Sequence, residues 1–178
     1  MIRSALLSDT EAILSVYAGY IDTTITFECA LPSVFEFRSR VQTISADYPY
    51  LVWEEDGRVL GYAYAHRYRE REAYQWGAEL SIYIDRRVQS KGVGRALYTE
   101  LIHRLRAQGV KTVYGCITLP NEKSVRLHES LGFTAAGVFH NAGYKNGAWH
   151  DVIWYEKAIA PYDTPAPIQK QTREEGST

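Results

Sequence analysis

The chain has 178 residues, 46% of them hydrophobic, which is enough to fill one core, so a single domain is expected. Its 20 Lys and Arg residues balance 21 Asp and Glu residues, which argues against nucleic acid or an anionic membrane surface as a partner. No long apolar segment or signal-peptide pattern is present, so a cytoplasmic protein is expected. Cys29 and Cys116 lie far apart without metal-ligand spacing, and reduced thiols are favoured over a disulfide.

The first part of the chain predicts a strand, two helices and a hairpin. Ser8 is a typical N-cap residue, and the acidic Asp9 and Glu11 follow it in the first turn of the expected helix. The expected elements are a strand over 2–7, a helix from Ser8 to about Tyr20, an extended loop over 23–28, a helix from Pro32 to about Ala46, and hairpin strands over 51–53 and 59–65.

The second part of the chain predicts strands that alternate with helices. The expected elements are a polar arm over 67–72, a strand over 74–84, a helix over 92–108 ended by Gly109, a strand over 112–117, a helix over 121–131, and strands over 135–144 and 149–156 that turn at Asn146-Gly147. This order predicts an α/β domain with a mixed sheet over residues 1–159. Residues 160–178 are rich in proline and charge, which predicts a flexible C-terminal tail with nothing to bury.

A glycine-punctuated turn between an apolar strand and a helix predicts an anion site. It consists of Gln89, Ser90, Lys91, Gly92, Val93, Gly94 and Arg95. Glycines let a ligand approach the main chain closely, and the free N–H groups and positive dipole end of a helix attract an anion. A pyrophosphate group is the ligand expected at such a site. Because Gly-x-Gly occurs in many strand–helix connections, the wider context has to support this interpretation.

Two separated motifs carry a family resemblance. Gln-x-x-Gly-x-Gly follows the fourth strand and Asn…Leu-Gly-Phe follows the fifth, and in this order they resemble the GNAT N-acetyltransferase superfamily over about residues 1–157. Within it, five segments are similar to the phosphinothricin and methionine sulfoximine N-acetyltransferases: residues 23–28, 71–76, 79–84, 121–129 and 143–149. The resemblance implies a central mixed, mostly antiparallel twisted sheet of about seven strands. Its fourth and fifth strands would splay apart, and about four helices would flank it.

The same resemblance implies acetyl-CoA as the cosubstrate, lying where the fourth and fifth strands separate, and no metal. The main chain of Ile82, Tyr83 and Ile84 would bond the pantetheine and the acetyl carbonyl, and the glycine turn would hold the pyrophosphate. Asn121 would anchor the pantetheine arm, and Ser124 would also bind the cofactor. Asn at a helix start is also a frequent N-cap, and both roles are compatible.

Acyl transfer to an amine needs a base for the amine and an acid for the departing thiolate. The resemblance places the base at Glu79, whose aromatic neighbours would raise its pKa, and which could act through one water. From position alone, an exposed or ion-paired strand glutamate is the alternative. His128 stands where many GNAT enzymes carry a Tyr as the acid of the thiolate, and imidazole can donate near neutral pH. The alternative is a packed histidine on a buried helix face.

The resemblance also implies an acceptor site for an amino acid. Its expected residues are Phe27, Glu28, Arg71, Tyr74 and Trp76. Arg71 would grip an α-carboxylate with two hydrogen bonds, although a solvated surface arginine is the alternative. Phe27 and Trp76 either wall the acceptor pocket or belong to the core. Gly77-Ala78 stands where the family often has a bulkier pair, which predicts added space and a shifted acceptor range.

The leading hypothesis is an N-acetyltransferase that moves the acetyl group of acetyl-CoA directly to the α-amino group of a small amino acid or analogue. Methionine sulfoximine and phosphinothricin are the family's typical acceptors, which implies a detoxifying or resistance role. One alternative is another amine acceptor, such as a protein N-terminus, a polyamine or an aminoglycoside, and a second is a non-catalytic acetyl-CoA-binding module. Arg69 and Arg71 argue against cationic acceptors, and the presence of Glu79 argues against the module. The family resemblance and the aromatics of the last strands predict a homodimer.

Overall fold

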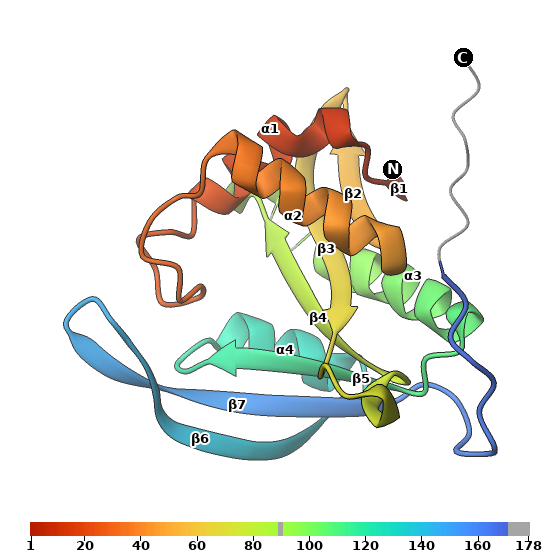
Figure 1. Cartoon of the computed structure of the whole chain (residues 1–178). Helices are drawn as coiled ribbons and strands as arrows, with labels where there is room; N and C mark the ends of the chain where they lie inside the picture. Colours follow the sequence, from red (N-terminus) through yellow and green to blue (C-terminus); the bar gives the residue numbers. More distant parts are fainter. Residues whose placement is uncertain (89–90, 171–178) are drawn as a thin grey trace.

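A seven-stranded sheet runs through the computed structural model, which describes residues 1–88 and 91–170 (Figure 1). The strands are β1 (Ile2–Ser4), β2 (Tyr50–Glu55), β3 (Arg58–Arg67), β4 (Gly77–Ile84), β5 (Thr112–Thr118), β6 (Thr134–Lys145) and β7 (Ala148–Ala158). Their order across the sheet is β1-β2-β3-β4-β5-β7-β6. Every neighbouring pair is antiparallel except β4 and β5, which are parallel. The predicted mixed, mostly antiparallel sheet is confirmed.

Helices connect the strands in the order that the sequence predicts. In the described residues the α-helices are α1 (Thr10–Ala18), α2 (Val34–Asp47), α3 (Val93–Gln108) and α4 (Glu122–Ser130). Short 3-10 helices, η1 (Leu7–Asp9), η2 (Glu72–Tyr74) and η3 (Arg86–Val88), precede α1, β4 and α3. No helix within residues 1–88 and 91–170 combines the length and apolar character that crossing a membrane requires.

The first two helices begin in different ways, and the cap predicted at Ser8 is wrong. Ser33 caps α2, because its Oγ accepts the Glu36 N–H at 3.2 Å while the Glu36 carboxylate accepts the Ser33 N–H at 2.8 Å. Ser8 instead lies inside η1, and α1 begins at Thr10. The N-cap of α1 is Asp9, which makes no side-chain capping bond, since its carboxylate is engaged by Arg3 at 2.7 Å.

Side-chain alternation along the strands builds one core on each face of the sheet. On one face, α1 and α2 pack against residues that include Val52 and Tyr62. On the other face, α3 packs against residues that include Leu51, Ala63 and Leu80. Successive strand residues point to opposite faces, which divides neighbours such as Leu51 and Val52 between the two cores. Figure 1 shows α1 and α2 lying together, with α3 beyond the sheet from them.

The parallel pairing of β4 and β5 is short. It joins Gly77–Glu79 to Thr112–Tyr114, and both strands continue beyond this register while diverging (Figure 1). On its other side, β5 pairs with β7 along its whole length. The predicted splay is therefore present, and it begins directly after Glu79.

Residues 160–170 lie against the domain, although the sequence predicts a flexible tail with nothing to bury. The contacts are Trp76 Nε1 to Ala166 O at 2.8 Å, Gln108 Nε2 to Gln169 O at 2.8 Å, and Lys111 Nζ to Asp163 Oδ1 at 2.7 Å. Ile168 packs against the core beside α3. Composition does not predict these contacts, because one isoleucine in a polar segment is too weak a signal. Residues 171–178 lie outside the described residues.

Candidate active site

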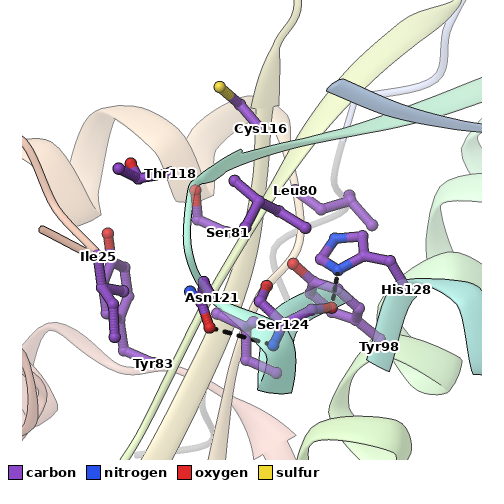
Figure 2. Close-up of a pocket in the computed structure, with 12 residues that line it drawn as sticks. Ile25, Leu80, Ser81, Tyr83, Tyr98, Cys116, Thr118, Asn121, Ser124 and His128 are labelled. Carbon is purple, nitrogen blue, oxygen red and sulfur yellow. Dashed lines mark hydrogen bonds between the residues drawn. The ribbon is translucent and has the colours of Figure 1, made fainter. Parts of the chain in front are cut away.

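A narrow cavity opens where β4 and β5 separate (Figure 2). Its volume is about 60 Å³. The lining residues are Ile25, Leu80, Ser81, Ile82, Tyr83, Tyr98, Cys116, Ile117, Thr118, Asn121, Ser124 and His128. Leu80 and Ser81 point to opposite faces of β4, yet both line the cavity. The cavity therefore lies in the gap between the strands rather than on one face of the sheet.

Glu79 stands at the start of this gap. It lies opposite Tyr114 in the last pair that joins β4 to β5, and its side chain is 21% exposed. Burial raises the pKa of Glu79, while the positive charges of His66 and Arg69 oppose that rise. His66 is directly across from Glu79 on β3, with its Nε2 3.9 Å from Glu79 Oε1. A mostly buried carboxylate with a raised pKa has the properties that a general base needs.

Cys116 lines the cavity close enough to respond to Glu79. Burial, and second the Glu79 charge, raise the pKa of the Cys116 thiol to about 12, so this side chain is neutral at physiological pH. Cys29 and Cys116 are both free thiols, as the sequence predicts. No three His, Cys, Asp or Glu side chains within residues 1–88 and 91–170 are arranged to hold a metal ion.

His128 lies on the α4 side of the cavity and is only 2% exposed. Its Nδ1 lies 2.8 Å from Ser124 O (Figure 2). A carbonyl oxygen only accepts, so Nδ1 carries a proton. Burial lowers the pKa of His128, and its buried Nε2 has no hydrogen-bond partner among the described residues. The neutral ring therefore offers Nε2 as an acceptor, and a role as the acid of the thiolate would first require its protonation.

Gly115 is a site residue that the sequence analysis missed. A Cβ at this position would lie 2.4 Å from His128 Nε2, so the imidazole fits only beside a glycine. An isolated glycine in a strand often marks such a close approach, but the sequence does not name the partner.

Asn121 is placed so that the two roles left open by the sequence are compatible. It is the N-cap of α4, where its Oδ1 accepts the Ser124 N–H at 3.2 Å (Figure 2). Both Asn121 and Ser124 also line the cavity. The Asn121 amide nitrogen is not used in this cap, and so a capping Asn121 can still donate to a ligand.

The main-chain groups of β4 differ in what they can still bond. The Asp85 N–H donates to Leu60 O at 2.8 Å, and bonding alternates along an antiparallel pair, so the groups of Tyr83 face β3 and those of Ile82 face the gap. The Tyr20 hydroxyl donates to Ile84 O at 2.5 Å and accepts the Ile84 N–H at 3.2 Å. Of Ile82, Tyr83 and Ile84, which were predicted to bind the cofactor through their main chain, Ile82 is the one whose main-chain groups face the gap. Tyr83 lines the cavity with its side chain instead.

The two glycines of the predicted pyrophosphate turn have different surroundings. Gly92 precedes α3 with φ +82°, and a Cβ there would meet nothing within 4 Å. A Cβ at Gly94 would lie 3.1 Å from Ile84 Cδ1 and 3.2 Å from Leu127 Cδ2. Gly92 therefore faces open space where a ligand can approach, while Gly94 faces the interior.

The other described residues of this turn are likewise either buried or exposed. Val93 is buried in the core beside α3, and Lys91 is exposed. Arg95 is also exposed, and its Nη2 donates to Ser130 O at 3.3 Å, toward α4. Gln89 and Ser90, both predicted to bind the cofactor, lie outside the described residues.

The predicted acceptor residues fall into three places. Phe27 and Glu28 lie on the loop that brings Ile25 to the cavity. Arg71 and Tyr74 are exposed on the polar arm before β4. Trp76 is not among the cavity residues, and its indole N–H is engaged by Ala166 O. None of the five residues lines the cavity itself: the first pair is connected to it through Ile25 of the same loop, and Trp76 contacts the C-terminal segment.

An aromatic cluster beside β4 was not expected from the sequence. Tyr68 stacks on Tyr114 with ring centroids 4.1 Å apart, and Trp154 meets Tyr68 edge-on at 6.0 Å. A Cβ at Gly77 would lie 3.1 Å from the Tyr114 ring. The space predicted from the small Gly77-Ala78 pair is thus filled by aromatic rings on the face of β4 that Glu79 shares.

Comparison with known proteins agrees with this geometry. A family model described as an acetyltransferase (GNAT) domain matches residues 2–154. The phosphinothricin N-acetyltransferase of Streptomyces viridochromogenes is 39% identical over 173 residues, which cover 97% of this chain and 94% of that protein. The L-methionine sulfoximine/L-methionine sulfone acetyltransferase of Pseudomonas paraeruginosa is 32% identical over 168 residues, which cover 90% and 95% of the two chains.

A solved structure agrees in fold. The phosphinothricin acetyltransferase of Sinorhizobium meliloti, crystallised in complex with acetyl-CoA, superposes with a TM-score of 0.89 and 33% identity, and the match covers 93% of this chain and 92% of that one. A splayed sheet, a mostly buried carboxylate at the splay and a glycine before α3 accompany these similarities. The chain therefore belongs to the GNAT acetyltransferase family, among relatives that are N-acetyltransferases of the phosphinothricin and methionine sulfoximine type.

Proposed function

We propose that the protein transfers the acetyl group of acetyl-CoA directly to the α-amino group of a small amino acid or analogue of the methionine sulfoximine or phosphinothricin type. The observation that carries this proposal is the mostly buried Glu79 carboxylate at the point where β4 and β5 separate. The names of the relatives support the acceptor class, and the complex of the Sinorhizobium meliloti enzyme supports the cosubstrate.

The residues of the gap fit acetyl-CoA. Asn121 and Ser124 line the cavity, and the main chain of Ile82 faces the gap like the free edge of a strand. The buried Nε2 of His128 lacks a protein partner among the described residues. Gly92 leaves open space at the start of α3, where a helix N-terminus favours an anion. These groups would hold the pantetheine and the pyrophosphate.

Bound acetyl-CoA supplies the acetyl group as an activated thioester. Glu79 removes a proton from the acceptor ammonium, directly or through one water, and so frees the nitrogen lone pair to form the new C–N bond. As the thioester C–S bond breaks, the attacking nitrogen loses its second proton and the departing thiolate takes up one proton, so of the two protons lost by the ammonium one is taken by Glu79 and one is balanced by the CoA thiol. His128 as the donor stays a prediction, and burial of its ring opposes the protonated state that this role requires.

Substitutions of the two glycines of the turn are expected to have different effects, one on cofactor binding and the other on the stability of the fold. Gly92→Asn keeps a residue that tolerates positive φ and adds a side chain in the open space, so it is expected to raise the KM for acetyl-CoA more than Lys91→Ala does. Gly94→Val places new atoms against Ile84 and Leu127, and is expected to destabilise the fold by about 1–3 kcal/mol. Steady-state kinetics and thermal melts measure the two effects. A folded Gly92→Asn protein with unchanged acetyl-CoA affinity contradicts this placement.

A panel of amines tests the function itself. The panel contains amino acids, methionine sulfoximine, phosphinothricin, an N-terminal peptide, a polyamine and an aminoglycoside, and the readout is release of free CoA. Turnover confined to amino-acid acceptors supports the proposal, and preference for another amine contradicts the acceptor assignment. Binding of acetyl-CoA without turnover on any amine would favour the non-catalytic module.

The homodimer predicted from the sequence belongs to the same proposal. Phe139, Tyr144 and Trp149 on the β6–β7 hairpin are 56%, 59% and 62% exposed. Large exposed aromatics grouped on one hairpin support an interface there. Sedimentation velocity measures the oligomeric state directly.

A further inference from the structure

The ammonium group of Lys145 lies in a cage of main-chain carbonyl groups. Lys145 ends β6 and is 5% exposed. Its Nζ donates to Ile21 O at 2.6 Å and to Thr23 O, Thr26 O and Glu28 O at 2.7 Å each. An ammonium has three N–H donors, so at least one of them is shared between two carbonyl oxygens. Four hydrogen bonds of this kind satisfy a charge that would otherwise be costly to bury.

All four carbonyl groups belong to one loop, residues 21–28, which connects α1 to α2 and has no helix or strand of its own. Two more contacts join this loop to the same hairpin. Asn146 Nδ2 donates to Asp22 O at 3.1 Å. The Phe27 ring lies against Gly143, where a Cβ would approach Phe27 Cε2 to 2.4 Å. The β6–β7 hairpin therefore contacts, at several points, a loop that lies more than a hundred residues earlier in the chain.

The loop in turn forms part of the active site. Ile25 lines the cavity between β4 and β5. Glu28 is held by two groups, because its Oε2 accepts from the Tyr17 hydroxyl at 2.5 Å and its Oε1 pairs with Arg40 at 2.7 Å. Tyr17 also bonds Thr26 Oγ1 at 2.7 Å. The side chains of the loop are thus tied to α1 and α2, while its main chain is tied to Lys145.

We propose that Lys145 is a positioning residue that sets the acceptor side of the active site by organising residues 21–28. This inference rests on the proposed function, since it assigns the loop to acceptor binding. The carbonyl groups of an irregular loop point in different directions unless a donor gathers them, and the single buried ammonium of Lys145 gathers four. Without these hydrogen bonds, the main chain that carries Ile25, Phe27 and Glu28 is no longer held in one conformation. No residue of β4 or α3 takes part in these hydrogen bonds, so both elements keep their positions.

The test compares Lys145→Met with Lys157→Met. Methionine keeps much of the length of the side chain and removes its donors. Lys157 is a matched control, because it lies on β7 of the same hairpin and donates to a single carbonyl, Leu131 O, away from the loop. Lys145→Met is expected to lower the acceptor kcat/KM by about 10- to 100-fold, mainly through KM, because misplacing a substrate-contacting element costs rates of this order. The acetyl-CoA Kd should change by less than about threefold, and Lys157→Met should resemble the wild type in both.

Hydrogen exchange of residues 22–28 provides a readout that does not depend on which amine is the acceptor. Lys145→Met should speed exchange there and leave β4 and α3 unchanged. If Lys145→Met does not fold, Gly143→Ala disturbs the loop through Phe27 instead, and the same acceptor KM and exchange changes are expected. Wild-type acceptor kinetics in a folded Lys145→Met protein, or an equal loss of acetyl-CoA affinity, overturns the inference. A wild type inactive on every amine refutes the proposed function instead, and the exchange comparison then still shows whether Lys145 holds the loop.

Discussion

Glu79→Gln is expected to lower kcat by about 10²- to 10⁴-fold at neutral pH while leaving acetyl-CoA affinity nearly unchanged. Glutamine keeps the shape of the side chain but has no lone pair basic enough to take the proton of the amine. The loss should shrink at high pH, where free amine is present without help from the enzyme. Initial rates over a range of pH, with acetyl-CoA titrations on the same samples, measure both effects. A variant within a few-fold of the wild type at neutral pH removes Glu79 from the mechanism.

The raised pKa of Glu79 leads to two further expected results, one for stability and one for the pH profile. Burial raises that pKa, so the native state favours the protonated carboxyl, and ionising it as the pH rises costs stability. The Glu79→Gln variant, which is neutral at this position, should therefore have a Tm near neutral pH that is no lower than that of the wild type. The His66 charge lowers the pKa of Glu79, so His66→Gln should move the acid limb of the kcat profile to higher pH. A shift to lower pH would contradict the assignment of that limb to Glu79.

Arg71→Ala is expected to lower kcat/KM for a carboxylate-bearing acceptor by about 10- to 150-fold. This corresponds to a loss of about 1.5–3 kcal/mol, the size expected when hydrogen bonding to a charged group is removed. The same change should barely affect the decarboxylated amine, because that acceptor never used the contact. Arg71→Lys should recover only part of the activity, since an ammonium cannot make the paired hydrogen bonds of a guanidinium. The measurement compares wild type and variant on methionine sulfoximine and on its decarboxylated analogue.

Arg69 is the matched control for Arg71. It lies on the same arm, with its guanidinium carbon 5.1 Å from the centre of the Tyr68 ring, and its charge lowers the pKa of Glu79. Arg69→Ala should therefore shift the pH profile for both acceptors equally. A loss specific to the carboxylate in Arg69→Ala, with none in Arg71→Ala, would move the acceptor contact to Arg69. Equal losses on both acceptors in Arg71→Ala would leave the amino-acid assignment without its main support.

Local signals predicted the elements and some of their ends. The α3 helix ends at Gly109, whose φ of +99° a glycine adopts without strain. Asn146 and Gly147 form the predicted turn between β6 and β7, with φ of +52° and +79°. Where a second interaction competed, the local signal failed. Ser8 was displaced as a cap, since the chain continues through η1 before α1 begins at Thr10.

Local patterns in the chain were enough to predict the order of strands and helices, and its motifs were enough to predict the family and to single out Glu79; anion binding by the turn before α3 stays a prediction. These features depend on residues close together in the chain or on motifs of fixed spacing. Only the tertiary structure showed that His66 faces Glu79, that Gly115 makes room for a neutral His128, and that Lys145 holds residues 21–28. Each of these contacts joins segments that are distant in sequence, and strand register and packing decide which partner is met. The contacts of residues 160–170 were not predicted for the same reason: their partners, which include Trp76 and Gln108, lie far away in the sequence.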